Sequence, residues 1–318
     1  VVRLGGQYLQ IYFWGGTALY IMVMGSSIFQ GAGNATIPMR IMMLATILNA
    51  VLDPIFIYGL FGVPRLEVRG AAVAAVISQG GAASVVLFLL ARGSRNVRVH
   101  PGRWRLGPLA WRVLEIGLPS SGQLLSRSIM GLVLMRIVAH SGTEAVAGYG
   151  IGLRFHMLVL IHSFALGNAL APIVGQNLGA RQPGRAQSAA WLAAGLGIGV
   201  MALSIAVLMG FADGLIRAFD NNPAVVSIGG TYLRTVSPAY LFAVVGIVIG
   251  RALQGAGDTM APMLSTVATM WFLQLPLAVG LSKIMVPAVH GVWWAINAAP
   301  LLHAVILALW FQTGRWKK

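Results

Sequence analysis

The chain reads Gln30-Gly31-Ala32-Gly33-Asn34 followed by Pro38-Met39, and it reads Gln254-Gly255-Ala256-Gly257-Asp258 followed by Pro262-Met263 at a constant offset of 224 residues. The match continues without a gap over residues 5–39 and 229–263, where ten of the 35 aligned pairs are identical. Self-similarity of this kind is typical of membrane proteins built from duplicated helix bundles. We therefore expect a parallel internal repeat, in which corresponding helices of the two copies run the same way.

The composition indicates a membrane protein. Of 318 residues, 58% are hydrophobic and 9% are charged, and the mean hydropathy is +0.81, whereas a soluble domain has about 25% charged residues. Apolar runs of about 20 residues can cross a hydrocarbon core of about 30 Å. The chain contains nine of them, over residues 8–30, 38–60, 71–91, 113–139, 147–172, 188–212, 225–252, 261–282 and 292–312. The sequence predicts an all-α polytopic membrane protein.

The net charge of +15 also fits a membrane protein. In a soluble protein it would suggest nucleic-acid binding, but the cytoplasmic loops of membrane proteins collect Lys and Arg. Residues 92–112 contain six arginines and no acid, and alternating spans place them on the same side as Lys317 and Lys318. We expect this side to be cytoplasmic in the inner (plasma) membrane, and we expect no nucleic-acid partner. The chain has no cysteine, which excludes disulfides and thiolate metal sites.

The positions of the repeats suggest the domain boundaries. The second copy of the repeat lies well inside a bundle that starts near Trp111, whereas the first copy begins almost at Val1. We expect a partial first lobe over residues 1–91, a basic cytoplasmic linker over 92–112 and a six-helix second lobe over 113–318. By this comparison about 110 residues, enough for three spans, would precede Val1, so that nine of twelve helices are expected here.

Further motifs combine with the repeat into a family resemblance. They are a run from Asn49 to Gly59 (NAVLDPIFIYG), then GLP at 117–119, AGYG at 147–150 and GQNLGA at 175–180. Together they resemble helices four to twelve of the multidrug and toxic compound extrusion (MATE) family. The resemblance implies two six-helix lobes that rock, exporting small amphipathic or cationic organic compounds in exchange for protons or sodium ions. It implies a secondary transporter in a lipid bilayer, with a small-molecule substrate and no cofactor, and we expect a monomer.

Asp53 is the leading candidate for the ion site. The other six acids lie in loops or at the ends of predicted spans, whereas Asp53 lies well inside one, and a charge near the bilayer centre costs about 2.5–3.5 kcal/mol. Asn49 and Thr46 lie four and seven residues earlier on one helical stripe, and their oxygens suit a proton or a sodium ion. The resemblance supports a cation site at Asn49 and Asp53. The repeat places Leu277 opposite Asp53, which confines a carboxylate site to the first lobe. In the alternative interpretation, Asp53 ends a helix ahead of Pro54 or caps a turn near the outer surface.

Polar side chains of the predicted second lobe are candidates for a substrate cavity. They lie inside or beside its apolar runs and are Gln123, Arg127, Asn168, Tyr240, Gln274 and His303. By the resemblance, Arg127 takes the place of a cation-binding Glu found in another branch, which argues against a sodium site in this lobe. Two alternatives stay open, an Arg127 hydrogen-bonded to helix carbonyls and a His303 packed as a neutral core residue.

Two other functions fit part of the sequence. A lipid-linked oligosaccharide flippase of a related two-lobed superfamily should have a strongly basic central cavity, which suits Arg127 but leaves the pair Asn49 and Asp53 unexplained. An intramembrane enzyme needs a nucleophile or a metal constellation, and the sequence contains no His-Glu-x-x-His, Gly-x-Ser-x-Gly or paired intramembrane acids. The sequence therefore favours an exporter and not an enzyme.

Overall fold

The computed structural model describes residues 2–93 and 107–317. Over these ranges the chain forms helices and no strand, and nine helical segments are long and apolar enough to cross a membrane. The chain divides into two compact units, which we call unit 1 (Val1–Arg105) and unit 2 (Leu106–Lys318). Of the expected basic linker, residues 94–106 lie outside the described residues, while Arg92 ends one helix and Arg112 lies in the next.

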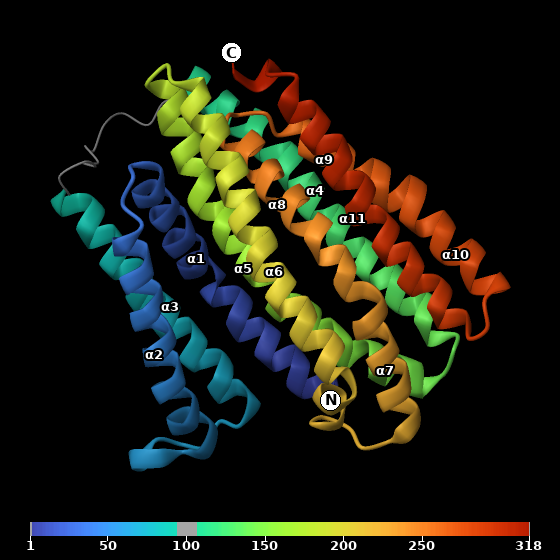
Figure 1. Ribbon diagram of the computed structural model, residues 1–318. Helices are drawn as coiled ribbons and strands as arrows, with labels where there is room; N and C mark the ends of the chain where they lie inside the picture. Colours follow the sequence, from blue (N-terminus) through green and yellow to red (C-terminus); the bar gives the residue numbers. More distant parts are fainter. Residues whose placement is uncertain (1, 94–106, 318) are drawn as a thin grey trace. The chain divides into compact units, whose positions relative to one another are not determined.

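Unit 1 consists of three long helices and a short 3-10 turn (Figure 1). They are α1 (Val2–Gly31), α2 (Thr36–Tyr58), η1 (Leu60–Gly62) and α3 (Val68–Arg92). α3 packs along both α1 and α2, which contact each other much less. Small residues allow the close approach, since Gly25 of α1 lies against Val86 and Gly70 of α3 lies against the backbone of Phe56.

Unit 2 contains six membrane-length segments in the part of the chain that the structure describes. They are α4 (Pro108–Ala139), α5 (Thr143–Gly179), α6 (Pro183–Arg217), α7 (Pro223–Val236) with η2 (Ser237–Ala239) and α8 (Tyr240–Gly255), α9 (Met260–Val267) with η3 (Ala268–Gln274) and α10 (Leu275–Ile284), and α11 (Ala288–Gln312), followed by η4 (Arg315–Lys317). α8 is central, because it packs against α5, α6 and α11. The predicted spans are confirmed, although α5 and α6 reach 37 and 35 residues because the turns beside the apolar runs are also helical.

Two spans that the sequence predicts as continuous are interrupted. The span over 225–252 contains the 3-10 turn η2, where Pro238 has no N–H to donate to the helix ladder. The span over 261–282 contains the π-helical η3 directly ahead of Pro276. Short π-helical stretches are frequent at functional sites. Hydropathy reveals neither interruption, because both segments stay apolar on average despite Ser237, Thr269 and Gln274.

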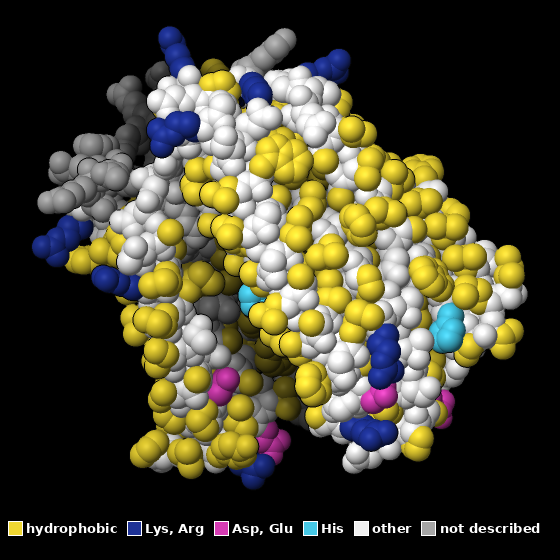
Figure 2. Space-filling view, viewed as in Figure 1, with side chains coloured by type: hydrophobic (Ala, Val, Ile, Leu, Met, Phe, Trp, Pro, Cys, Tyr) yellow, Lys and Arg dark blue, Asp and Glu magenta, His cyan; other side chains and the backbone are white. Residues whose placement is uncertain are grey.

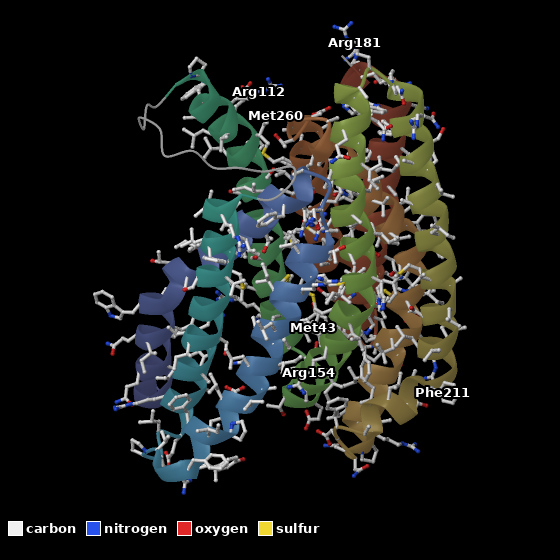
Figure 3. All side chains as sticks on the ribbon, turned by 90° about the vertical axis from the view of Figure 1, so that its left-hand side faces the viewer. Met43, Arg112, Arg154, Arg181, Phe211 and Met260 are labelled. Atoms are coloured by element: carbon white, nitrogen blue, oxygen red, sulfur yellow. The ribbon has the colours of Figure 1, made fainter. Side chains whose placement is uncertain are left out.

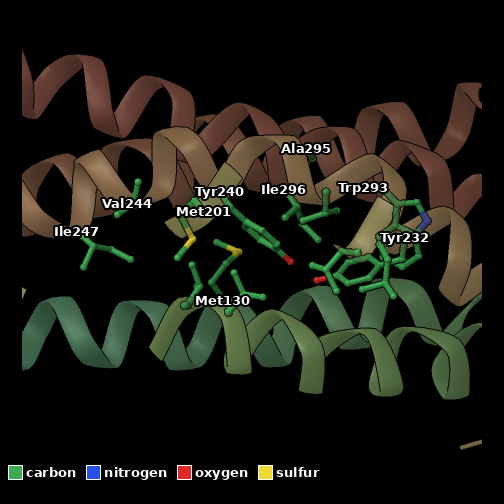
Figure 4. Close-up of a cluster of buried hydrophobic side chains, with 14 of the residues drawn as sticks. Met130, Met201, Tyr232, Tyr240, Val244, Ile247, Trp293, Ala295 and Ile296 are labelled. Atoms are coloured by element: carbon green, nitrogen blue, oxygen red, sulfur yellow. The ribbon is translucent and has the colours of Figure 1, made fainter. Parts of the chain in front are cut away.

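Aromatic side chains form part of the core of unit 2. The rings of Tyr149, Tyr232 and Trp293 meet with centroid separations of 5.3, 5.1 and 4.8 Å, and all three side chains are buried. Figure 4 shows this core continuing along the bundle through Tyr240 and Met130. Such pairs add about 0.5–1.5 kcal/mol each beyond the burial of their surface, so this part of unit 2 is expected to be rigid.

Both copies of the repeated motif fold into the same turn. Gly33 and Gly257 adopt left-handed backbone conformations with φ of 84° and 90°. In each turn the next residue, Asn34 or Asp258, donates its backbone N–H to the carbonyl five residues earlier at 2.9 Å. This is the bond of a helix C-terminus closed by glycine. In both units the motif therefore ends one helix with a left-handed glycine.

The surface of unit 2 is that of a membrane bundle. Figure 2 shows hydrophobic side chains over the middle of its visible face and charged side chains toward the helix ends. Figure 3 shows Arg112 and Arg181 at one end of unit 2 and Phe211 toward the other. The C-terminal segment lies at the end with Arg181, because Lys317 Nζ donates to Gln187 Oε1 at 2.6 Å.

Candidate functional site

In unit 1, α2 places Asn49 and Asp53 one helical turn apart. Asn49 Nδ2 donates to Asp53 Oδ1 at 3.4 Å, which is at the long end of the hydrogen-bond range. Both residues are half-buried within the chain. Among the residues that the structure describes, no Lys or Arg forms an ion pair with Asp53. The carboxyl group therefore has an amide beside it and no described counter-charge.

The helix continues past Asp53. Pro54 lies inside α2, and the helix ends only at Tyr58, followed by Gly59 with a left-handed backbone. The alternative in which Asp53 ends a helix is therefore wrong. Five residues of helix correspond to about 7.5 Å, so Asp53 lies within the last turn and a half of the span.

A cavity of about 190 Å³ opens beside Asn49 between the helices of unit 1. Its polar lining comes from Thr46 and Asn49 of α2 and from Ser78 and Gln79 of α3. Asp53 lies one turn further along α2 and does not line it. The cavity gathers the amide and hydroxyl oxygens that the sequence assigns to a cation site, and it adds two side chains from α3 that the sequence did not single out.

The hydroxyl groups that line this cavity can still bind a cation. Thr46 Oγ1 donates to the carbonyl of Met42 at 2.9 Å, and Ser78 Oγ donates to the carbonyl of Ala74 at 2.8 Å. A hydroxyl that donates in this way still has lone pairs that can accept a hydrogen bond or bind an ion. Hard oxygen ligands of this type suit sodium more than a transition metal.

In unit 2, four of the six predicted cavity residues line one cavity of about 140 Å³, which we call cavity A. They are Arg127 of α4, Tyr240 of α8, Gln274 of η3 and His303 of α11. Four elements far apart in the sequence therefore each supply one of the polar side chains. The sequence indicates the residue types, and the packing of the helices brings them together.

Histidines contribute the most specific contacts of cavity A. His303 Nδ1 lies 2.8 Å from Ser265 Oγ, while its Nε2 is buried without a hydrogen-bond partner among the described residues. His156, which the sequence analysis did not select, lies with Nδ1 3.1 Å from the hydroxyl of Tyr240. His303 is therefore only half satisfied, which differs from a fully packed core histidine.

A second cavity of about 310 Å³, cavity B, shares Arg127 with cavity A. A chain of hydrogen bonds runs along it. Arg251 Nη1 donates to Gln254 Oε1, Gln254 Nε2 donates to Gln123 Oε1, and Gln123 Nε2 donates to Thr266 Oγ1, each at 2.9 Å. Gln123 is thus placed beside Arg127 as predicted, whereas Arg251 and Gln254 were not anticipated, because they stand at the end of an apolar run next to the repeated turn.

Asn168 and Arg127 complete the set of predicted residues. Asn168 is exposed on α5 and lines neither cavity A nor cavity B. Arg127 lines both cavities, and among the described residues it has no ion pair.

The sequence of the chain matches a known protein family. The MatE family model matches residues 1–55 and 119–279. The chain belongs to the MatE family. It is 27% identical, over 98% of its length, to the "Probable multidrug resistance protein NorM" of Thermotoga maritima, of which it covers 67%. It is 30% identical, over 85% of its length, to the "FAD transporter" of Shewanella oneidensis, of which it covers 60%.

A solved MATE structure shows the same fold. The structure described as "Outward-facing conformation of a multidrug resistance MATE family transporter of the MOP superfamily" matches this chain with a TM-score of 0.89 at 24% identity, over 96% of this chain and 68% of the other. The MatE chain thus spans about two thirds of the length of these proteins.

Membership of the MatE family confirms the resemblance found in the repeat and the motifs. The family consists of multi-pass membrane transporters, so the prediction that the chain is not an enzyme is confirmed at the level of the family.

Proposed function

We propose that this MatE chain forms part of a secondary active efflux transporter, which exports a small amphipathic organic compound in exchange for protons or sodium ions. Membership of the MatE family and the multidrug resistance proteins among its relatives support export. The observation on which the coupling mechanism depends is Asp53, a carboxyl group inside a membrane-length helix with no ion pair among the described residues. Because the chain spans two thirds of its relatives, the activity is proposed for the transporter that contains these residues.

The coupling step follows from the charge of Asp53. A charged side chain costs about 2.5–3.5 kcal/mol at the centre of a membrane-spanning helix, and an ionised Asp53, about 7.5 Å from the end of α2, costs part of that. A proton or a sodium ion bound there neutralises it and lowers the free energy of any state in which unit 1 is less hydrated. The Asn49 amide lies between the carboxylate and the adjoining cavity, and the oxygens of Thr46, Asn49 and Gln79 in that cavity supply ligands to a sodium ion beside Asp53.

The substrate is assigned to the cavities of unit 2. Cavity A combines an aromatic side chain, Tyr240, and the flexible Met270 with polar groups, and such linings adapt to ligands of varied shape. The relatives' names include both multidrug resistance proteins and an FAD transporter, so family membership alone does not fix the compound.

A lipid-linked oligosaccharide flippase is the second candidate. The two arginines that line cavity B, Arg127 and Arg251, favour it, since a substrate of that class carries acidic groups. The carboxyl group and amide of Asp53 and Asn49 are better explained by ion-coupled export, because a flippase does not require an intramembrane acid in the first unit.

Replacement of Asp53 tests the exporter function. In a transporter that contains residues 1–318, Asp53→Asn removes the ionisable group, keeps its size and is expected to lower proton- or sodium-driven dye efflux from vesicles at least tenfold. Glu67→Gln is the matched control, because Glu67 precedes α3 and is half-exposed beside Arg65. Efflux by Asp53→Asn at the rate of the parent protein would remove Asp53 from the mechanism.

A further inference from the structure

We propose that cavities A and B of unit 2 bind an acidic group, a carboxylate or a phosphate on an apolar body, held by Arg127 and Arg251. The inference rests on the proposed export function and narrows its substrate class. It narrows the amphipathic compounds of the proposed function to acids, and it differs from the cationic compounds that the family resemblance implies.

The charge of the lining is the first argument. Arg127 lines both cavities and Arg251 lines cavity B, and none of the described lining residues is an Asp or a Glu. Buried charges in proteins are normally paired, because an unpaired one loses its hydration without compensation. A cation entering here would meet two like charges and no carboxylate.

Two acids of unit 2, Asp213 and Asp258, are held by other partners. Asp213 forms a bidentate pair with Arg234, with both N–O distances at 2.9 Å. Asp258 accepts hydrogen bonds from Trp310 Nε1 and from the backbone N–H of Ala261. Among the described residues, neither Arg127 nor Arg251 has an ion pair. The positive charge of the cavities is therefore not neutralised within unit 2.

The arginines are positioned by their surroundings. Arg251 donates to the neutral side chain of Gln254, which orients the guanidinium group without cancelling its charge. The stem of Arg251 passes over Gly167 of α5, where a Cβ atom would lie 2.6 Å from Arg251 Cγ. Planar guanidinium groups bind carboxylates and phosphates through two parallel hydrogen bonds, which a lysine cannot reproduce.

His303 offers a further donor on the same lining. When Ser265 Oγ donates to Nδ1 of His303, the ring proton resides on Nε2, the buried nitrogen without a described partner. An acceptor oxygen of a bound acid satisfies that nitrogen. A buried polar atom without a partner is unfavourable, so a ligand that supplies the partner gains from it.

The remainder of cavity A is apolar. Its walls include Leu160, Ala243, Ile247, Met270 and Ile296. These side chains suit a ring or a short hydrocarbon and not a second charged group. The lining as a whole therefore matches an amphipathic acid, with the acidic group at Arg127 and the apolar body along α8 and α11.

Matched naphthalene probes test the inference directly. Binding of 2-naphthoate, 1-naphthyl phosphate and 2-naphthylmethylammonium is measured by calorimetry on the 318-residue chain in nanodiscs of zwitterionic lipid. Both acids are expected to bind at least tenfold more tightly than the amine. Equal or tighter binding of the amine would overturn the proposal, and so would the failure of both acids to bind.

Variants locate the site. Arg127→Gln and Arg251→Gln are each expected to weaken binding of the acids at least tenfold, and Arg127→Lys should give a smaller loss because it keeps the charge without the fork. Arg136→Gln is the matched control, since Arg136 is exposed near the C-terminal end of α4 and lines neither cavity. Unchanged binding in both Gln variants would contradict the site. If neither variant folds, the comparison of acid and amine on the parent chain decides.

Lipid composition identifies the source of the acid. If a lipid phosphate occupies the site, nanodiscs of anionic phosphatidylglycerol will weaken naphthoate binding at constant ionic strength, and Arg127→Gln will abolish that difference. If a free acid is the ligand, binding will be alike in both lipids. Measurements of export test the proposed function independently of acid binding. Asp53-dependent export of a cation without acid binding refutes only this inference, and acid binding without ion-driven export refutes only the exporter function.

Discussion

At the scale of the residue, glycines determine how close the helices around the unit 2 cavities can approach. Gly246 of α8 faces His303, and a Cβ atom there would lie 2.7 Å from His303 Cδ2. His303 is buried and held at 2.8 Å by Ser265, so it has little freedom to retreat. Gly199 of α6 has no neighbouring atom within 4 Å of the corresponding position.

Replacing each of these two glycines by alanine is predicted to change the free energy of unfolding in opposite directions. Gly→Ala in a helix gains about 0.5–1 kcal/mol of helix stability, while overpacking costs about 1–3 kcal/mol. Gly246→Ala should therefore lower the free energy of unfolding by about 1 kcal/mol, and Gly199→Ala should raise it slightly. Unfolding in mixed detergent micelles, followed by tryptophan fluorescence, measures both. If the Gly246→Ala protein were as stable as the Gly199→Ala protein, the side chain of His303 would be able to move away from the added Cβ atom at little cost.

The sequence could predict polar and charged residues that stand out in the middle of an apolar run. Asp53 and Arg127 stand out because a charge within an apolar run is costly and needs a reason. Arg251, Gln254 and His156 were missed because their importance depends on contacts across helices, such as His156 with Tyr240, which periodicity along one helix does not encode.

At the scale of the element, the repeated turn also starts the helix that follows it. Asn34 Oδ1 accepts hydrogen bonds from the backbone N–H groups of Thr36 and Ile37, both at 3.1 Å. Asp258 Oδ1 accepts one from Ala261 at 3.1 Å, and its Oδ2 also accepts one from Trp310 Nε1 at 2.8 Å. The one non-identical position at the core of the motif therefore has an added tertiary contact in unit 2.

This difference predicts unequal effects of matched substitutions. Asn34→Ala removes a helix cap and should destabilise unit 1 by about 0.5–2 kcal/mol. Asp258→Ala removes a cap and a charge-assisted bond to Trp310, which adds about 1.5–3 kcal/mol. Chemical unfolding of each variant should rank Asp258→Ala as the more damaging, and Trp310→Phe should reproduce only the second loss. Equal losses for Asn34→Ala and Asp258→Ala would mean that the indole contact contributes little.

Helices were predictable at this scale, and their interruptions were not. Long apolar runs bounded by Gly and Pro gave all nine spans, since backbone groups in a membrane are satisfied within helices. The breaks at η2 and η3 change hydrogen bonding within spans whose mean hydropathy stays high, so an apolar window passes over both. Pro238 and Pro276 were the available signals.

At the scale of the whole molecule, charge divides unit 2 into two different ends. Arg181 and Arg185 stand where α5 turns into α6, and the C-terminal Lys317 bonds to Gln187 near the same end. The far end of α6 carries Asp213 together with Arg217. A helix of 35 residues is about 52 Å long and can cross a membrane completely. The excess of Lys and Arg at one end is the basis for placing that end, with the C-terminus, in the cytoplasm.

The absence of cysteine makes this orientation directly measurable. Gln182 and Asn221 are exposed in the turns at opposite ends of α6. With a membrane-impermeant maleimide, Asn221→Cys should be labelled in intact cells, whereas Gln182→Cys should be labelled only after the membrane is opened. Both should react after denaturation, and the parent chain gives no background. Six spans return the chain of unit 2 to its starting side, so the C-terminus lies on the same side as Gln182. The reverse labelling pattern would therefore place the C-terminus outside and show that the arginines at that end do not set the orientation.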